Sequence, residues 1–185
     1  MSAEQARHGV AASLGTDQAN VDRVTDAMLR DLFLNGDFGV SLDGKAPILD
    51  AAERSHMRDV GGLVRVLAVL EVGALLTLLL TVGRLGRQRN ARGWVLLRAA
   101  AGIGLAAVVL GVFFAVAFDT AFAAFHALFF RAGTWQFGPD SNLIRLFPEP
   151  FWFETSLLAG VTIVLSAVLA AWQARRDLAT ATVPA

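Results

Sequence analysis

The chain contains no cysteine, which excludes a disulfide framework and any thiol chemistry. It also contains no tyrosine, so aromatic anchoring at a membrane surface falls to tryptophan alone. Charged residues make up only 17% of the 185 residues, below the roughly 25% of a soluble domain. The formal net charge is zero, which leaves no basic face and no expectation of a nucleic-acid partner. The composition therefore argues against a soluble domain.

The low fraction of charged residues is due to three long apolar runs, at 66–83, 99–118 and 151–172. Each has about 18 to 22 residues, enough for a helix to cross a hydrocarbon core of about 30 Å. Trp94, Trp152 and Trp172 lie at or near the ends of these runs, where aromatic belts form. The sequence therefore predicts an all-α integral membrane protein with a bundle of three transmembrane helices.

Arginines fix the expected orientation. The short loop between the first two runs holds Arg84, Arg87, Arg89 and Arg92 and no acid, and Arg175-Arg176 follows the third run. Arginines beside membrane spans favour the cytoplasm, and the two clusters agree because two spans separate them. We therefore expect a multi-pass protein of the bacterial cytoplasmic membrane whose N-terminal 60 residues and segment 119–150 face outward.

Translocating that N-terminal part raises a difficulty, because residues 1–20 contain no apolar signal region. Either the first span carries the tail across, or the natural protein has an upstream span that this chain lacks. We favour the upstream span, since the rest of the chain obeys the positive-inside rule.

Capping, alternation and hydropathy patterns in the sequence divide the chain into segments. Residues 38–42 alternate like a short strand, and Asp50 with Glu53 forms a capping-box pattern that starts a long helix. The expected organisation is a disordered tail 1–19, an α/β extracytoplasmic cap and helix extension 20–60, a transmembrane helix 61–83, a cytoplasmic loop 84–92, a transmembrane helix 93–118, an extracytoplasmic helix and loop 119–150, a transmembrane helix 151–174 and a cytoplasmic tail 175–185.

His56 precedes the first span, in a setting suited to acid–base chemistry. Glu53, His56 and Asp59 are three residues apart and share one helix face. A carboxylate one turn away can orient an imidazole and stabilise its charged form. The alternative interpretation is an ordinary solvent-exposed helix face. Taken by itself, the cluster of Glu53, His56 and Asp59 favours this alternative.

His126 follows the second span at an equivalent depth, with Asp119 two turns earlier. Taken alone, His126 is interpreted as a histidine at the membrane interface. Together with His56, it could contact a lipid headgroup from two sides. Arg145 can hold an oxyanion or simply anchor at the interface, and Trp135 can position the headgroup. A zinc site of two histidines with Asp59 or Asp119 is a minor alternative without a metal-binding motif, so we expect no metal and no cofactor.

Two segments carry a family resemblance. Residues 49–60 follow a Glu-x-x-His-x-x-Asp-Val pattern, and 125–137 with 143–148 form a longer and more specific signature. They resemble the bacterial integral membrane family of the lipoprotein intramolecular transacylase, over about residues 21–172 of this chain. The resemblance implies four membrane helices with a cap after the first, so this chain would lack the first helix. It also implies catalytic histidines matching His56 and His126.

The resemblance implies a membrane acyltransferase. It would move an acyl chain from the diacylglyceryl group of a lipoprotein to the amine of its N-terminal cysteine, with the two histidines as acid and base. The alternative is a non-enzymatic integral membrane protein that binds lipid or a protein partner through its cap. A channel or transporter is disfavoured because the spans contain little polarity.

Overall fold

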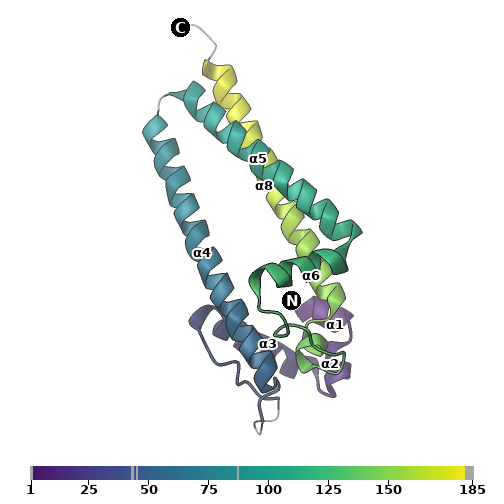
Figure 1. Ribbon diagram of the computed structural model, residues 1–185. Helices are drawn as coiled ribbons and strands as arrows, with labels where there is room; N and C mark the ends of the chain where they lie inside the picture. Colours follow the sequence, from purple (N-terminus) through teal and green to yellow (C-terminus); the bar gives the residue numbers. More distant parts are fainter. Residues whose placement is uncertain (1, 43, 45, 87, 182–185) are drawn as a thin grey trace. The chain divides into compact units, whose positions relative to one another are not determined.

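The computed structural model describes residues 2–42, 44, 46–86 and 88–181, and these form helices joined by loops (Figure 1). Arg87 and the last residues of the tail 175–185 lie outside the described residues. The helices are α1 Ser2–Arg7, α2 Val10–Leu14, α3 Gln18–Leu34, α4 Ala51–Leu85, α5 Arg89–Val116, α6 Phe118–Phe129, α7 Asn142–Leu146 and α8 Glu149–Ala181.

Three of these helices, α4, α5 and α8, are long and apolar enough to cross a membrane. The predicted all-α class is thereby confirmed, with three long apolar helices in the part of the chain that the structure describes. The chain divides into a first unit, Met1–Val69 with Phe122–Phe153, and a second unit, Leu70–Ala121 with Glu154–Ala185.

The predicted α/β cap is wrong, because no strand occurs in the part of the chain that the structure describes. Residues 38–42 form no strand, and the backbone bond from Ile48 N–H to the Val40 carbonyl, 2.9 Å, is not part of a ladder. Phe38 takes a left-handed conformation with φ 57° and buries its ring. Its N–H donates to the Asp31 carboxylate, so side-chain burial and a side-chain acceptor replace strand pairing.

The segment 1–19, expected to be a disordered tail, instead forms α1 and α2 and the start of α3. Val10 is buried, and Gln5 donates through Nε2 to Thr25 Oγ1 and to the Leu146 carbonyl. Because that amide is fully buried and hydrogen-bonded, it ties α1 to α3 and α7. Asp17 caps α3, and its side chain accepts from Asn20 N–H at 2.8 Å.

One apolar core joins the helices of the first unit. It is formed by Val10, Val21, Val24, Met28, Phe38, Ile48, Leu49, Leu143, Leu146, Phe147 and Phe151. Burial of about a dozen such side chains is the main stabilising term for this cap. The core holds α7 against the start of α4.

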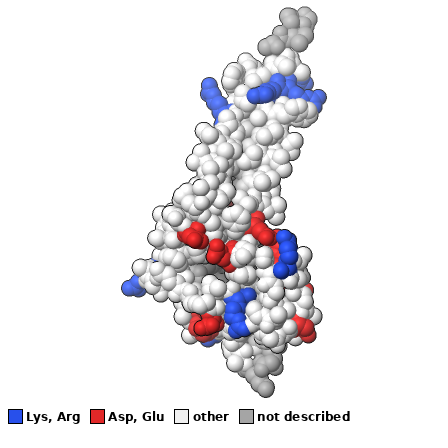
Figure 2. All heavy atoms as spheres, turned by 90° about the vertical axis from the view of Figure 1, so that its right-hand side faces the viewer, with Lys and Arg blue, Asp and Glu red and all other residues white. Residues whose placement is uncertain are grey.

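The second unit packs α5 closely against α8. A side chain at Gly93 would lie 2.7 Å from Leu178 Cγ, so only glycine permits this approach. Arg92 makes a two-pronged ion pair with Asp177, with N–O distances of 2.8 and 2.7 Å. Figure 2 shows arginine side chains gathered at the end of this unit where α5 begins.

Candidate active site

His56 lies in the second turn of α4, and the predicted capping box fixes where that helix begins. Glu53 N–H donates to Asp50 Oδ1 and Asp50 N–H donates to Glu53 Oε2, each at 2.8 Å. This reciprocal pair satisfies two amides at the helix start. It thereby sets the rotation of the first turns, which carries His56 inward until its side chain is only 6% exposed.

His126 lies in the last turn of α6 and is 8% exposed. Its Nδ1 donates to the carbonyl oxygen of Phe122 at 2.8 Å. A carbonyl can only accept, so Nδ1 carries the proton. In the neutral ring Nε2 then holds the lone pair, which makes Nε2 the basic atom of this side chain.

The two histidines come together. Their ring centroids are 5.9 Å apart and the ring planes are inclined by 28°. They lie seventy positions apart in the sequence, so the tertiary fold, and not local spacing, brings the two rings together. One small polar group can therefore be reached by both rings.

Aromatic rings enclose this pair. Phe130 contacts both imidazoles, at 4.9 Å from His56 and 5.4 Å from His126. Trp135 lies 4.8 Å from His126, and Phe137 lies 5.6 Å from His56. Such surroundings exclude water and strengthen electrostatic effects on a group that develops charge.

Two buried polar atoms beside the pair lack hydrogen-bond partners within the described ranges. They are Nδ1 of His56 and Nε1 of Trp135. Buried polar atoms are nearly always hydrogen-bonded, so each exception calls for an explanation. The indole nitrogen of Trp135 can only donate, so an oxygen atom of a ligand is a suitable partner for it.

Burial also sets the charge of His126. It lowers the pKa of His126 below the ordinary value of 6.5, while the hydrogen bond to the Phe122 carbonyl acts in the opposite direction. A lowered histidine pKa means that the neutral, basic form persists to more acidic pH. His126 is therefore a free base at neutral pH.

A titration can check this charge state. The chain has three histidines, so ring-labelled protein should give three resolvable imidazole signals, assigned by single substitutions. We expect the His126 signal to titrate with a midpoint below 6.5, because burial disfavours the imidazolium. A midpoint at or above that of a free histidine would contradict the buried setting.

Glu53 has a different role from the one its spacing suggested. Besides the capping bond, its Oε1 accepts from the Ser141 hydroxyl at 2.5 Å and from Leu143 N–H at 3.1 Å. The carboxylate is 2% exposed and forms no hydrogen bond to His56 among the described residues. Glu53 therefore joins the start of α4 to the start of α7.

Within the described ranges, the remaining predicted residues form no hydrogen bond with the histidine rings. Asp59 is exposed and forms no hydrogen bond with His56, and Asp119 is exposed in the first turn of α6. The Nδ1 partner of His126 is the Phe122 carbonyl, not a carboxylate. Arg145 bonds to Asn142 at 3.4 Å within α7. In the described part of the chain no three His, Asp or Glu side chains gather as metal ligands.

Sequence reasoning missed Phe130 and Ser141. Phe130 stands one helical turn after His126, so the spacing of four was a usable signal. Ser141 caps α7, and its hydroxyl oxygen accepts from Ile144 N–H at 3.3 Å. Its bond to Glu53, 88 residues away, had no local signal.

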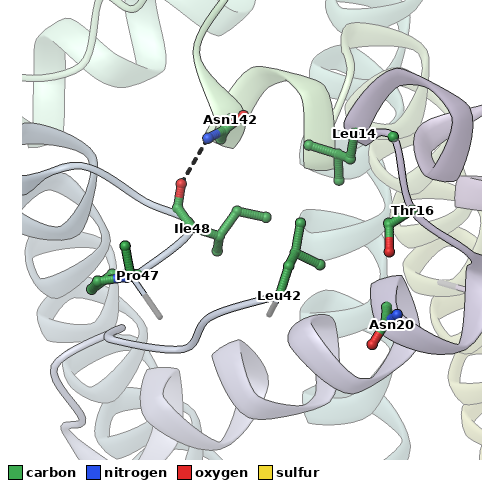
Figure 3. A pocket seen from close by; sticks show the side chains of 9 residues that line it. Leu14, Thr16, Asn20, Leu42, Pro47, Ile48 and Asn142 are labelled. Atoms are coloured by element: carbon green, nitrogen blue, oxygen red, sulfur yellow. Dashed lines mark hydrogen bonds between the residues drawn. The ribbon is translucent and has the colours of Figure 1, made fainter. Parts of the chain in front are cut away.

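The first unit contains a cavity in the cap and another beside the histidine pair. The larger is in the cap, lined by Leu14, Gly15, Thr16, Asn20, Leu42, Ala46, Pro47, Ile48 and Asn142 (Figure 3). None of the histidines lines it. The second, of about 470 Å³, shares Phe130 with the histidine pair.

Two comparisons with known proteins match this chain. The sequence profile described as lipoprotein intramolecular transacylase Lit matches residues 2–152. The solved structure of the membrane-integral lipoprotein intramolecular transacylase Lit from Bacillus cereus is similar at a TM-score of 0.82 and 18% identity, covering 97% of this chain and 82% of that one. A search of curated protein sequences found no match.

Proposed function

The chain belongs to the lipoprotein intramolecular transacylase family, an enzyme family, and from that premise we propose how its residues carry out the reaction. The substrate would be a bacterial lipoprotein whose N-terminal cysteine carries a diacylglyceryl group and a free α-amine. The observation that supports the proposal is the buried pair of His56 and His126, 5.9 Å apart, beside two unpaired polar atoms.

The proposed step moves one acyl chain within the substrate. The amine nitrogen attacks the ester carbonyl at the middle glycerol carbon, so a C–N bond forms and the C–O bond to glycerol breaks. The amine loses one proton and the glycerol oxygen gains one, so no oxidant or cofactor is needed. Because both groups belong to one molecule, holding them together supplies much of the rate increase.

His126 would move the proton. Its Nε2 takes the proton from the attacking amine, and the resulting imidazolium delivers it to the leaving glycerol oxygen. The Phe122 carbonyl keeps the ring in the tautomer that this requires. A histidine with a lowered pKa suits the first half of the step, since it starts neutral.

His56 and Trp135 would stabilise the oxyanion. Both Nδ1 of His56 and Nε1 of Trp135 are buried without partners in the described chain, and an indole nitrogen can only donate. In this role His56 would carry its ring proton on Nδ1, and donors that are in place before the reaction lower the barrier for developing negative charge without reorganisation. This assigns carbonyl polarisation to His56 and proton transfer to His126.

The other predicted residues would act indirectly. Glu53 positions the first turns of α4 through its bonds to Ser141 and Leu143. The carboxylate of Asp59, one turn after His56, would stabilise positive charge passing through the site. Asp119 and Arg145 enter the proposal through the sequence pattern alone, as an orienting acid and a headgroup contact.

We also propose that the site faces outward from the bacterial cytoplasmic membrane. The support is the arginine-rich connection between α4 and α5 together with Arg175 and Arg176 near the end of α8. Such arginines mark the cytoplasmic side, and the histidines lie at the opposite ends of α4 and of the segment α5–α6. A lipoprotein amine becomes available on that outer side.

Fragmentation mass spectrometry of a lipoprotein N-terminus tests the reaction. Intramolecular transfer leaves the intact mass unchanged, so fragments must locate the acyl chain. We expect cells expressing the chain to yield an N-acylated cysteine bearing a monoacylglyceryl group, absent from matched cells without it. A diacylglyceryl cysteine with a free amine, despite confirmed membrane expression, would overturn the proposal and favour a lipid-binding or partner-binding protein.

A further inference from the structure

The cavity beside the histidine pair, the second one of the first unit, has no role in the proposed reaction. It measures about 470 Å³, within the range of pockets that hold small organic ligands. Its lining comes from α4 and from the end of α6 with the residues just after it: Arg58, Asp59, Gly62, Leu63, Val66, Phe129, Phe130 and Arg131.

The cavity changes character along α4. Arg58 and Asp59 come first, and Leu63 and Val66 follow one to two turns later, where the apolar run of the helix begins. Neither Arg58 nor Arg131 has a side-chain hydrogen bond or ion pair within the described ranges. The lining thus combines two guanidinium groups and one carboxylate with aliphatic and aromatic walls, and it suits a molecule with an oxygen-rich head and an apolar chain.

The cavity adjoins the histidine pair through one ring. Phe130 is a wall of the cavity and also contacts His56 at 4.9 Å and His126 at 5.4 Å. A molecule whose head lies beside Phe130 is thus within one side chain of both imidazoles. This adjacency is what a reacting ester would need.

Gly62 leaves the cavity wall open. A Cβ built on Gly62 meets no atom within 4 Å, in contrast to the neighbouring Gly61, where it would lie 3.2 Å from the Leu32 carbonyl. Glycine inside a helix is destabilising by about 1 kcal/mol relative to alanine. The absence of a side chain at 62 therefore enlarges the cavity without serving close helix packing.

We propose that this cavity binds the diacylglyceryl end of the lipoprotein substrate, with Arg58 and Arg131 on the ester oxygens and one acyl chain passing Gly62 toward Leu63 and Val66. The inference rests on the proposed function and adds a substrate-binding site with a residue that sets how much chain it admits. A chain too short to reach Gly62 gains nothing from the open wall.

The test compares the same substitution inside and outside the cavity, in the full chain reconstituted in phospholipid nanodiscs. Gly62→Leu fills the open wall, and Gly73→Leu, on the same helix at another open position, does not line the cavity. The substrates are synthetic diacylglyceryl lipopeptides with one peptide and long or short acyl chains. We expect Gly62→Leu to raise KM for the long-chain lipopeptide by about tenfold or more, with little change for the short-chain one. Gly73→Leu should leave both unchanged.

Other outcomes would overturn the site. They are an unchanged KM in Gly62→Leu, or an equal loss for every chain length. If the wild-type protein turned over no lipopeptide, the proposed function would fail, and the site would be judged by photo-crosslinking instead. A lipopeptide with a diazirine at the chain end should label the segment 58–66 or 129–131 and lose that label in Gly62→Leu. Labelling elsewhere, or labelling of this segment by a diazirine phospholipid that excess lipopeptide does not displace, would refute the inference.

Discussion

Replacing His126 with alanine is expected to reduce acyl transfer by about 10²- to 10⁴-fold, because the variant lacks the atom that moves the proton. The basic Nε2 of this ring is available only because Nδ1 is committed to the Phe122 carbonyl at 2.8 Å. The measurement is the initial rate of N-acyl product formation from a diacylglyceryl lipopeptide. The protein should still insert into the membrane, since the ring contributes to the site and to few other contacts.

A second substitution separates the loss of the base from the loss of packing. In His126→Asn the side-chain amide can still donate to the Phe122 carbonyl, but no basic nitrogen remains. We expect it to be as inactive as the alanine variant and to unfold at a temperature closer to the wild type. Activity near the wild-type rate in His126→Asn would exclude His126 as the base.

The other histidines complete this comparison. His56→Ala should also lower the rate strongly, since it removes one of the two unpaired buried polar atoms proposed to bind the oxyanion. His8, in the connection between α1 and α2, serves as the matched control, and His8→Ala should retain activity. Full activity in both site variants would remove the acid–base proposal and favour a binding protein.

The parts of the fold that the sequence predicted are those with local physical causes. The Asp50–Glu53 capping box consists of two short-range hydrogen bonds, and it occurs where the pattern placed it. The three long apolar helices follow from hydrophobicity alone. The expectation that His56 and His126 act together came from two sources: their equivalent positions at the ends of two predicted spans, and the family resemblance.

Other features depend on tertiary packing and could not be read locally. Residues 38–42 have strand-like alternation, yet no neighbouring strand exists among the described residues to pair with them. The second apolar helix ends at Ala117, with φ −139°, where the sequence has neither proline nor glycine. The segment of α1 and α2 is polar enough to look disordered, but Gln5 and Val10 are buried there against distant helices.

Glu53 shows most clearly that sequence spacing does not identify tertiary partners. Its spacing from His56 suggested an acid that orients the imidazole. Its neighbours in space are the Ser141 hydroxyl and the Leu143 amide, about ninety residues later in the chain. Between His126 and those partners, the chain contributes Phe130, Trp135 and Phe137 to the walls of the site. Glu53 therefore holds one end of the segment that encloses the two imidazoles.

Replacing Glu53 with alanine should therefore both destabilise the protein and reduce its activity. The substitution leaves the amides of Asp50 and Leu143 and the Ser141 hydroxyl without their acceptor. Hydrogen bonds to a buried charged group contribute about 1.5 to 3 kcal/mol each, so a loss of about 3 kcal/mol is expected after partial relaxation. Thermal unfolding in detergent should show a clearly lower midpoint, and kcat should fall even at temperatures where the variant remains folded, because Trp135 and Phe137 lose their fixed positions.

A double-mutant cycle with Ser141 separates this connection from a general loss of charge. Ser141→Ala removes one of the donors, so its effect and that of Glu53→Ala should be less than additive. Glu53→Gln keeps one acceptor oxygen and should fall between the wild type and Glu53→Ala in both midpoint and kcat. Strict additivity in the cycle would show that the carboxylate and the hydroxyl are not coupled. A Glu53→Ala variant with normal stability and normal kcat would show that the contact between α4 and α7 does not position the histidine pair.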